Sequence, residues 1–456
     1  MTRLLILGGG PAGYVAAGRA AQLGAEVVLV EAREIGGTCL NRGCIPTKAM
    51  VAGVERLQAA CAASEYGVVV GPVSLDFPAF MARKAAVAAQ LRDGVAHLLK
   101  ARKVQVVAGR ASLAGPGRLA LEDGSRLEGD AVILASGSEP VRMRLFDWSD
   151  PRVLTSDELL AIDHVPETLL IVGGGVIGCE FASVFSRLGA RVIVVEMLDQ
   201  LLPGEDKRTG RTLQQAFKKA GIAVHVKAAV EAATSAVGGV TLRLASGEEL
   251  TASRVLVAVG RKPVSAGLGY EEAGVAIDKR GFVVVDEGCR TTLPGVFAAG
   301  DLAGPPLLAH WAYHQGAIAA ENAVTGSRLA CDRSLVPNCV FSTPEVASCG
   351  LTEDRAAAAG RVVEVTGVRF GGNSKAVCDG DAEGFVRLVS EPGGGRLLGA
   401  SLVGPHVTEL VHELALAVHA GLSLADVAAT IHAHPTLSEA VGEAALAGLG
   451  RGLHSL

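Results

Sequence analysis

Two cysteines with four residues between them, Cys39 and Cys44, lie in the segment GGTCLNRGCIPTK, which spans residues 36–48. Two thiols at this spacing can close a small ring and cycle between a disulfide and a dithiol. This segment therefore predicts redox chemistry, with Cys39 and Cys44 as the reacting pair.

Two other functions for the pair fit the sequence less well. A structural zinc site needs four ligands, often with C-x2-C spacing, and the other seven of the nine cysteines are scattered without such a pair. A structural disulfide across so short a loop restricts the unfolded chain little, and a chain of 456 residues has a large core without one. Because no such pair occurs, we expect no metal site. Because the cysteines form no disulfide framework, we expect a reducing, cytoplasmic location, where a disulfide is usually catalytic.

A dinucleotide-binding fingerprint precedes the cysteines. The expected elements are a strand over residues 4–7, a helix over 14–23 and a strand over 26–30 that ends on Glu31. Gly8, Gly10 and Gly13 lie between the first strand and the helix in G-x-G-x-x-G spacing. The first glycine allows the tight turn, the second lets the backbone approach a pyrophosphate, and the third lets the helix pack on the strand. The helix N-terminus adds amide hydrogens, and Glu31 can accept hydrogen bonds from a ribose.

The whole unit occurs a second time. Gly8, Gly13, Gly24 and Glu31 correspond to Gly173, Gly178, Gly189 and Glu196, each 165 positions further along the chain. The expected strand, helix and strand span residues 169–172, 179–188 and 191–195, and Gly175 is the middle glycine of the turn. A complete unit repeated in register indicates two nucleotide-binding domains.

Three more apolar strands end in glycine. One strand ends on Gly137 near the close of the first unit, and another ends on Gly260 near the close of the second. The third, over residues 295–299, runs into Gly300 and Asp301 without a nucleotide-binding helix of its own. We interpret it as the return of the chain to the first domain, with Asp301 facing a cofactor. The remaining expected elements are strands within 336–349 and 385–403 and helices over 408–420 and 424–429, which are typical of an α+β domain.

Composition excludes several other classes of function. The net charge of −5 and the pI near 6.2 give no basic surface for nucleic acid. Hydrophobic residues make up 49% of the chain, yet no run of 18 or more apolar residues predicts a membrane span. Arg3 and the apolar stretch after it could start a signal peptide, but they continue directly into the first nucleotide-binding unit. We therefore expect no nucleic acid and no membrane as a partner.

Over nearly its full length, the sequence resembles the pyridine nucleotide–disulfide oxidoreductase family, and within it the lipoamide branch. The segments that carry the resemblance are GGGPAGYVAA (8–17), GGTCLNRGCIPTK (36–48), GGGVIGCE (173–180), VEMLDQLLPGEDK (195–207), AAGD (298–301) and HAHPTLSE (432–439). The chain lacks the additional C-terminal Cys-Cys pair of mercuric reductases, and we expect no lipoyl domain before residue 1.

The resemblance implies an α/β fold with two Rossmann-like dinucleotide-binding domains and a C-terminal α+β dimerisation domain. The implied boundaries are 1–140 for the first part of the FAD-binding domain, 141–264 for the NAD-binding domain, 265–332 for the return to the FAD or central domain, and 333–456 for the interface domain. FAD would bind the first fingerprint, tightly but without a covalent bond, and NAD the second. The residues expected to contact these cofactors are Gly8, Gly10, Gly13, Glu31, Gly37, Thr38, Lys48, Ala111, Gly137, Gly173, Gly175, Gly178, Glu180, Glu196, Gly260, Gly300, Asp301 and Ala309.

The resemblance also assigns catalytic roles. Cys39 would exchange disulfides with reduced lipoamide, and Cys44 would face the flavin. His434 would be the base, held by Glu439, and would act across the two-fold axis of a homodimer; His432 is interpreted as structural. Lys48 and Glu180 would pair near the flavin, where a lysine stabilises negative charge. The implied partners are a lipoylated carrier and the core of a 2-oxo acid dehydrogenase or a glycine-cleavage system.

Some residues depart from the family's pattern and leave alternatives open. Trp311, Tyr313 and His314 follow a segment, LLAH, where the family often has Lys or Glu, and they could alter either the dimer interface or the channel on the disulfide side. Two classes of function remain: an enzyme, or a binding component of a multienzyme assembly with an idle redox centre. Within the enzyme class, the alternative is an NAD(P)H-dependent reductase of another disulfide. The intact cysteines and the His-Glu motif favour the lipoamide enzyme.

Overall fold

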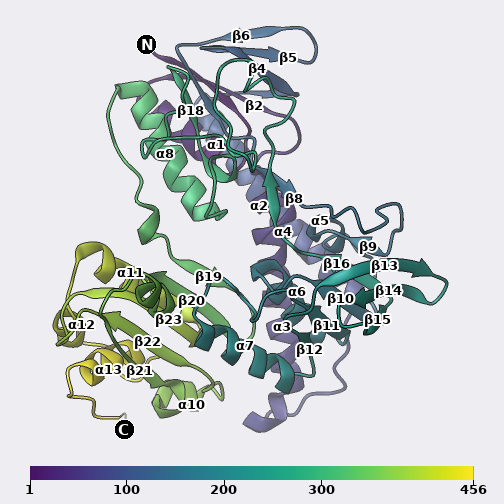
Figure 1. Ribbon diagram of the computed structural model, residues 1–456, viewed down its shortest axis with the longest axis vertical. Helices are drawn as coiled ribbons and strands as arrows, with labels where there is room; N and C mark the ends of the chain where they lie inside the picture. The colour runs from purple at the N-terminus through teal and green to yellow at the C-terminus, as the bar shows by residue number, and fades with distance from the viewer. Residues whose placement is uncertain (455–456) are drawn as a thin grey trace.

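The first sheet of the computed structural model, which describes residues 1–454, is parallel and lies near the N-terminus (Figure 1), and the first glycine turn follows its central strand. Its strands, in spatial order, are β18 (Val296–Ala298), β7 (Ala131–Leu134), β1 (Arg3–Leu7), β2 (Glu26–Glu31) and β3 (Gln105–Ala108). The turn leads from β1 into α1 (Pro11–Gln22), and α8 (Ala309–Thr325) packs against α1. Residues far apart in the sequence therefore meet around one turn, because β18 adds to the edge of the sheet at β7.

The second sheet repeats this arrangement. Its order is β12 (Ala223–His225), β11 (Arg191–Val195), β10 (Thr168–Val172), β16 (Arg254–Val257) and β9 (Val153–Leu154). The central strand β10 is followed by α6 (Val176–Arg187) and lies between β11 and β16, as β1 lies between β2 and β7. The central strands are buried over almost their whole length, which explains their continuous apolar sequences. The surrounding helices are α5 (Ser156–Leu159) and α7 (Lys207–Lys219).

The C-terminal part is an antiparallel sheet covered by helices. The sheet order is β19 (Asn338–Val340), β20 (Glu345–Gly350), β23 (Leu397–Gly404), β22 (Phe385–Ser390) and β21 (Glu364–Arg369). Three helices build a core with its apolar side chains: α11 (Val407–Ala420), α12 (Leu424–Ala429) and α13 (Glu439–Gly448). The expected α/β fold with two Rossmann-like units and a separate C-terminal α+β domain is confirmed.

Three smaller antiparallel sheets complete the fold. Two have three strands each: β4 (Ala111–Gly115), β5 (Arg118–Leu121) and β6 (Arg126–Glu128), and β13 (Val230–Ala236), β14 (Gly239–Leu244) and β15 (Glu249–Ala252). The third pairs β8 (Ser138–Pro140) with β17 (Arg261–Pro263), which joins the ends of the two nucleotide-binding units. The remaining short elements are α9 (Glu353–Ala358), α10 (Ser374–Cys378) and the 3-10 turns at Ala63–Tyr66, Gly300–Ala303, Arg333–Leu335 and Phe370–Gly372.

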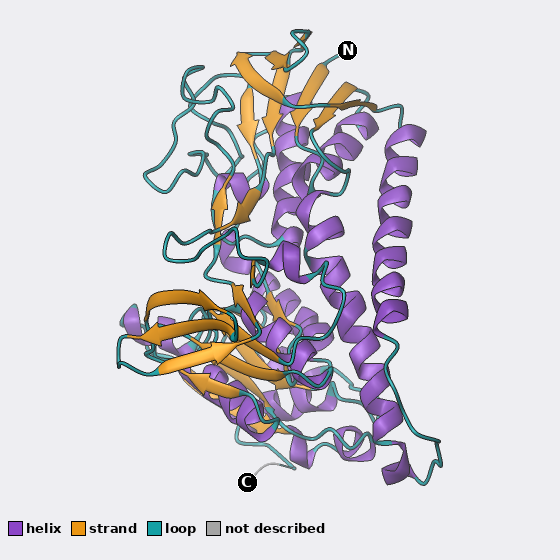
Figure 2. Ribbon diagram, turned by 90° about the vertical axis from the view of Figure 1, so that its right-hand side faces the viewer, coloured by secondary structure: helices purple, strands orange, loops and turns teal. Residues whose placement is uncertain are grey.

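The cysteine segment begins a pair of long helices. After the short α2 (Gly37–Arg42), α3 (Cys44–Cys61) packs against α4 (Phe77–Ala101), and these long helices run along one side of the molecule (Figure 2). Met50 of α3 is buried in one cluster with Phe181 of the second unit and Val403 of the C-terminal sheet. This cluster fixes α3, and with it the cysteines, against both neighbours. Within residues 1–454, no helix is long and apolar enough to span a membrane.

Candidate active site

The glycine turns have the close packing that only glycine allows. Gly8 and Gly173 have φ of +108° and +111°, in the region that disfavours side chains. A Cβ atom on Gly13 would lie 1.8 Å from the Gly8 carbonyl oxygen, and one on Gly178 would lie 1.9 Å from that of Gly173. The first and third glycines of each turn therefore serve the packing of strand on helix.

The middle glycine of each turn faces open space. A Cβ atom on Gly10 would meet nothing nearer than the Gly37 Cα at 3.8 Å, and one on Gly175 would meet nothing within 4 Å. Both turns thus present a bare backbone at a helix N-terminus, which suits the approach of a pyrophosphate. The donor set of both turns fits a dinucleotide.

The acid at the end of the second strand closes each turn in the same way. Gly9 N donates to Glu31 Oε2 at 2.6 Å, and Gly174 N donates to Glu196 Oε2 at 2.7 Å. The other carboxylate oxygens accept from Arg33 N and Leu198 N, each at 2.7 Å. The repeat seen in the sequence therefore extends to individual hydrogen bonds.

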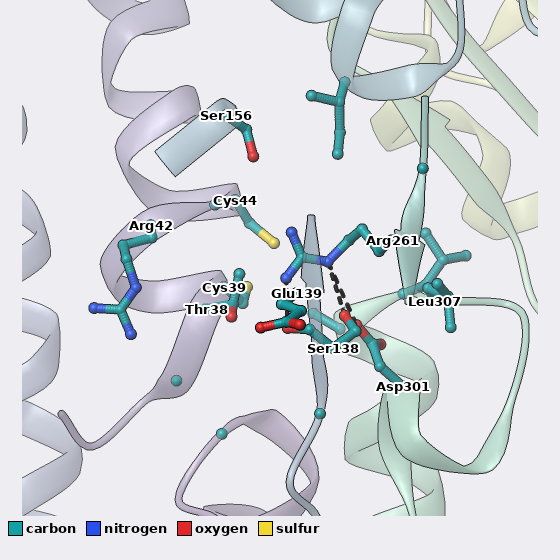
Figure 3. A pocket seen from close by; sticks show the side chains of 18 of the residues that line it. Thr38, Cys39, Arg42, Cys44, Ser138, Glu139, Ser156, Arg261, Asp301 and Leu307 are labelled. Carbon is teal, nitrogen blue, oxygen red and sulfur yellow. Dashed lines mark hydrogen bonds and ion pairs between the residues drawn. The ribbon is translucent and has the colours of Figure 1, made fainter. Parts of the chain in front are cut away.

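One cavity of about 1100 Å³ is lined by residues of both turns and by the cysteines. Figure 3 shows the pocket from close by, with Cys39 and Cys44 beside Ser138 and Asp301. The residues expected at the site that line it are Gly8, Gly10, Glu31, Gly37, Thr38, Cys39, Cys44, Lys48, Ala111, Gly137, Gly173, Gly175, Glu180, Glu196, Gly260, Gly300, Asp301 and Ala309. Gly13 and Gly178 lie behind it, in the packing of the turns. His434 and Glu439 do not line it.

The two cysteines are free thiols on either side of a helix break at Gly43. The hydrogen bond that the Cys39 thiol donates lowers the pKa of Cys44, and the positive charge of Lys48 lowers it further. The same hydrogen bond, with burial, raises the pKa of Cys39. Cys44 is also the first residue of α3, where the positive end of the helix dipole favours a thiolate. The pair is therefore polarised: its surroundings favour the thiolate form at Cys44 and the thiol form at Cys39.

Lys48 reaches across from α3 to the second unit. Its Nζ lies 2.6 Å from Oε1 of Glu180 and 4.4 Å from the ring centre of Phe341. Glu180 is buried and also accepts a hydrogen bond from Phe341 N at 3.0 Å. Phe341 comes from the C-terminal domain and was not identified from the sequence, because no local motif marks it.

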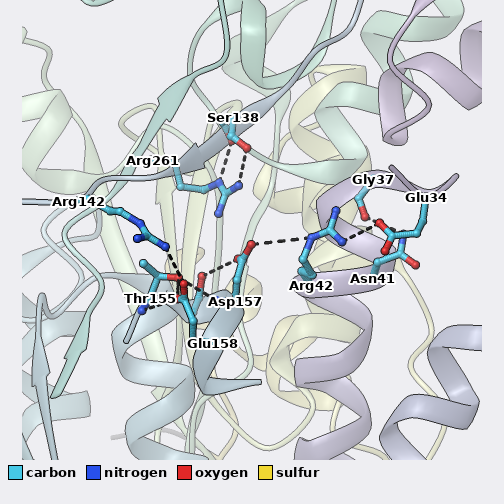
Figure 4. Close-up of polar contacts among 11 residues, drawn as sticks. Glu34, Gly37, Asn41, Arg42, Ser138, Arg142, Thr155, Asp157, Glu158 and Arg261 are labelled. Carbon is cyan, nitrogen blue, oxygen red and sulfur yellow. Dashed lines mark hydrogen bonds and ion pairs between the residues drawn. The ribbon is translucent and has the colours of Figure 1, made fainter. Parts of the chain in front are cut away.

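A polar network at the β8–β17 junction was also missed in the sequence. Arg261 Nε donates to Ser138 Oγ at 2.8 Å, and Ser138 Oγ in turn donates to the Asp301 carboxylate (Figure 3). Nearby, Arg42 lies between Glu34, at 2.7 Å, and Asp157 of α5, at 3.8 Å (Figure 4). These contacts tie the cysteine segment and Asp301 to the second unit.

The aromatic residues that depart from the family's pattern fall into two places. Tyr313 on α8 is hydrogen-bonded to Tyr14 on α1, with ring centres 5.8 Å apart. Burial raises the pKa of both hydroxyls, and nearby Cys39 raises them further. Tyr313 therefore lies on the disulfide side of the site. Trp311 stacks on His314, at 5.8 Å, and His314 faces another cysteine, Cys331.

The His-Glu motif forms on the C-terminal domain. His434 Nδ1 lies 2.9 Å from Glu439 Oε1, and His434 is 70% exposed. Hydrogen bonds from Thr436 N and from His434 lower the pKa of Glu439. His432 is nearly buried and pairs with Glu413 at 2.9 Å. Within one chain the structure does not bring His434 to the cysteines, so a contact between them needs a second chain.

Two dinucleotide turns and a polarised dithiol around one cavity define a dinucleotide-dependent disulfide oxidoreductase. The chain belongs to the pyridine nucleotide-disulphide oxidoreductase family: the model of that family matches residues 2–316, and the model of its dimerisation domain matches residues 336–445. The family and the oxidoreductase class expected from the sequence are therefore confirmed. Membership implies flavin and pyridine nucleotide cofactors, and the two turns fit them.

Individual relatives resemble the whole chain. It is 41% identical to the dihydrolipoyl dehydrogenase of Haloferax volcanii, covering 100% of this chain and 98% of that protein. It is 39% identical to a dihydrolipoyl dehydrogenase of Bacillus subtilis, and the match covers 99% of this chain and 98% of that protein. Among solved structures, LpdA from Mycobacterium tuberculosis has a TM-score of 0.91 at 30% identity, covering 98% of this chain and 99% of that one. The flavoprotein disulfide reductase RclA from Escherichia coli has a TM-score of 0.88 at 28% identity, and the match covers 97% of this chain and 99% of that one.

Proposed function

We propose that this protein oxidises protein-bound dihydrolipoamide to lipoamide and reduces NAD to NADH, through FAD and a disulfide between Cys39 and Cys44. The observation that carries this proposal is the polarised pair, because Cys44 begins α3 inside the cavity that both glycine turns share. The dihydrolipoyl dehydrogenases that match the chain over its whole length support the choice of substrate.

The two turns would hold different cofactors. The first turn, with Glu31, Thr38 and Asp301, would bind FAD, and the second, with Glu180 and Glu196, would bind NAD. Bound FAD supplies two-electron transfer between the dithiol and the nicotinamide. Lys48 would place its positive charge beside this transfer, held in position by Glu180.

The cysteines would act in sequence on the substrate. A lipoyl thiolate attacks the Cys39 sulfur of the Cys39–Cys44 disulfide, so that a mixed disulfide forms and Cys44 leaves as a thiolate. The second lipoyl sulfur then attacks the first, which closes the lipoyl disulfide and expels Cys39 as a thiolate that takes up a proton. Lys48 and the α3 N-terminus stabilise the Cys44 thiolate meanwhile.

His434 would remove the proton from the substrate thiol. An imidazole suits proton transfer at neutral pH, and Glu439 would fix its orientation through the 2.9 Å contact with Nδ1. Because His434 is exposed and remote from Cys39 in its own chain, it would serve the site of the partner in a homodimer. The matching dimerisation-domain model supports this assembly.

The proposed setting follows from the substrate. Lipoamide on a carrier protein implies the core of a 2-oxo acid dehydrogenase or a glycine-cleavage system as partner. The proposed location is the cytoplasm, because the cysteines form no disulfide framework. One observation, the likeness to RclA, supports the alternative, which is an NAD(P)H-dependent reductase of another disulfide.

A substrate panel tests the proposal. FAD-loaded protein is assayed with dihydrolipoamide and either NAD or NADP, and with glutathione disulfide or Hg(II) and either reduced nicotinamide. Efficient NADH formation from dihydrolipoamide, with little reduction of the other two, is expected. Faster reduction of glutathione disulfide would favour the alternative.

A further inference from the structure

A second pair of cysteines lies away from the cavity. Cys289 Sγ and Cys331 Sγ are 3.9 Å apart, although 42 positions separate them in the sequence. Neither residue lines the cavity that holds Cys39 and Cys44. Cys289 is only 1% exposed, whereas Cys331 is partly exposed. One cysteine of the pair is therefore partly exposed, and the other is buried beside it.

The backbone holds these two sulfurs together. Cys331 N donates to Glu287 O at 2.8 Å, and the buried Asn322 side chain donates to both Gly288 O and Leu329 O at 3.0 Å. Cys289 has a φ of +63°, a conformation that is uncommon outside glycine. This conformation is held by two backbone hydrogen bonds: Cys289 N donates to Asp286 O, and Cys289 O accepts from Ala298 N, each at 3.0 Å. The juxtaposition thus rests on ordered backbone contacts on both sides.

A histidine completes the cluster. His314, stacked on Trp311, is hydrogen-bonded to Cys331, which raises the pKa of the imidazole. The hydrogen bond from Cys289, followed by that of His314, lowers the pKa of Cys331 to about 6 against the effect of burial. The hydrogen bond to Cys331, together with burial, raises the pKa of the Cys289 thiol, and the Cys289 sulfur also lies 3.7 Å from the Gln315 main-chain oxygen. The surroundings therefore favour the thiolate form at the partly exposed Cys331 and the thiol form at the buried Cys289.

A metal site explains this cluster less well than redox chemistry does. No group of three or more His, Cys, Asp or Glu side chains placed to hold a metal ion occurs in the described part of the chain. A partly exposed cysteine with a lowered pKa and a second cysteine beside it is instead the arrangement of a peroxide-reactive cysteine with its resolving partner.

We propose that Cys331 and Cys289 form a second redox-active pair, which hydrogen peroxide converts to a disulfide. The Cys331 thiolate attacks one peroxide oxygen, the O–O bond breaks, and the hydroxide released takes a proton to become water, which leaves a sulfenic acid on Cys331. The Cys289 sulfur then attacks the Cys331 sulfur, the S–O bond breaks, and a second water leaves with the Cys289 proton. The dithiol loses two electrons, and the peroxide gains them. The sulfurs must close from 3.9 Å to about 2.05 Å.

The position of Cys331 gives this disulfide a structural effect. Cys331 lies in the connector between α8 and the C-terminal sheet, whereas Cys289 precedes β18 of the first sheet. Oxidation would therefore fasten the connector to the first domain. It would also remove the Cys289 proton from beside the main-chain oxygen of Gln315, a residue whose side chain accepts from Gly300 N at 3.0 Å at the edge of the cavity.

Peptide mapping of the FAD-loaded full-length protein tests this proposal. The protein is reduced, freed of reductant and treated with a few-fold excess of hydrogen peroxide; remaining thiols are then alkylated and the digest is analysed by mass spectrometry. A peptide linking Cys289 to Cys331 is expected. Cys289→Ser should leave a Cys331 sulfenic acid that dimedone captures, and Cys331→Ser should leave Cys289 unmodified.

Reaction rates supply a second readout. Cys331 should be alkylated at pH 7 about ten-fold faster than Cys378, an exposed cysteine on α10. His314→Gln should slow the alkylation of Cys331 and shift the midpoint of its pH dependence to higher pH. The alkylation of Cys378 should be unchanged. The proposal is overturned if no Cys289–Cys331 peptide forms while Cys39 and Cys44 become oxidised in the same sample. It is equally overturned if Cys331 reacts no faster than Cys378.

Discussion

Lys48 Nζ and Glu180 Oε1 lie 2.6 Å apart and join the helix that begins with Cys44 to the helix that follows the second glycine turn. Glu180 is only 5% exposed, so its carboxylate depends on this cation and on the Phe341 amide. The ion pair thus couples the charge beside the dithiol to the packing of the two dinucleotide units.

Opposite changes at these two residues should move the Cys44 titration in opposite directions. The Lys48 charge lowers the pKa of Cys44 and that of Glu180 raises it. In the reduced protein, Lys48→Gln should therefore shift the midpoint for Cys44 thiolate formation to higher pH, and Glu180→Gln should shift it to lower pH. The pH dependence of Cys44 alkylation, followed by mass spectrometry, measures both. A shift in the same direction for both variants would contradict this electrostatic coupling.

The cysteines should be spectroscopically distinct. With Cys44 as the thiolate beside bound flavin, FAD-loaded Cys39→Ser should show a long-wavelength charge-transfer band without any reductant, because Cys44 no longer has a disulfide partner. Cys44→Ser should lack the band. Visible titration of both variants against pH decides this, and the reverse pattern would mean that the two roles are exchanged.

Glu196 should select NAD over NADP. Its buried carboxylate lines the cavity at the end of β11, where a ribose 2′-hydroxyl is bound in this fold. A 2′-phosphate would meet a negative charge there, so NAD should be preferred by on the order of 100-fold in kcat/KM. Steady-state kinetics with each cofactor measure the ratio, and comparable values would refute this role of Glu196.

Two glycines of the second turn should respond differently to the same methyl group. In Gly178→Ala the new Cβ would lie 1.9 Å from the Gly173 carbonyl oxygen, so the free energy of unfolding should fall by roughly 3 kcal/mol. In Gly175→Ala nothing lies within 4 Å of the new Cβ, and the free energy of unfolding should fall by less than about 1 kcal/mol. That methyl group occupies the approach to the pyrophosphate, so NADH binding should weaken about ten-fold.

Thermal unfolding and NADH fluorescence titration separate these effects. A loss of stability in Gly175→Ala equal to that in Gly178→Ala would show that the middle glycine is also required for packing.

The nucleotide-binding units were predictable almost to their ends. Strand 191–195 matches β11, and the expected helices over 14–23 and 179–188 begin only three residues after α1 and α6 do. The reason is local: three glycines at fixed spacing determine where the strand ends, where the turn lies and where the helix starts. The Lys48–Glu180 pairing came instead from the family resemblance, since no local pattern joins residues so far apart.

Contacts between distant segments were not predictable. Phe341 reaches Lys48 from the C-terminal sheet, and Arg261 reaches Ser138 through a two-stranded pairing that no hydrophobic pattern marks. Cys289 and Cys331 were counted among scattered cysteines, because the contacts that bring them together, those of Asn322 on α8 and of Glu287, leave no pattern in the sequence. The expected place of His434 at the catalytic site depends on a second chain, and it stays a prediction.

Mixed dimers test that prediction. Cys44→Ser and His434→Ala homodimers, each nearly inactive, are unfolded and refolded together with FAD. With random pairing, about half of the dimers are mixed, and each of these contains one site with both lesions and one with neither. Activity should recover to about a quarter of the wild-type value. Activity that stays at the level of the parents, in dimers shown to be mixed and FAD-loaded, would place His434 outside the partner's site.

NADH formation from dihydrolipoamide is the most direct test of the proposed function. Wild-type protein, Cys39→Ser, Cys44→Ser and the control Cys378→Ser, all loaded with FAD, are compared at saturating NAD. Wild type and Cys378→Ser should turn over equally, and each variant of the dithiol should be slower by at least about 1000-fold. Wild-type protein that forms no NADH, or a Cys44→Ser variant that keeps the wild-type rate, would contradict dihydrolipoamide oxidation through this dithiol.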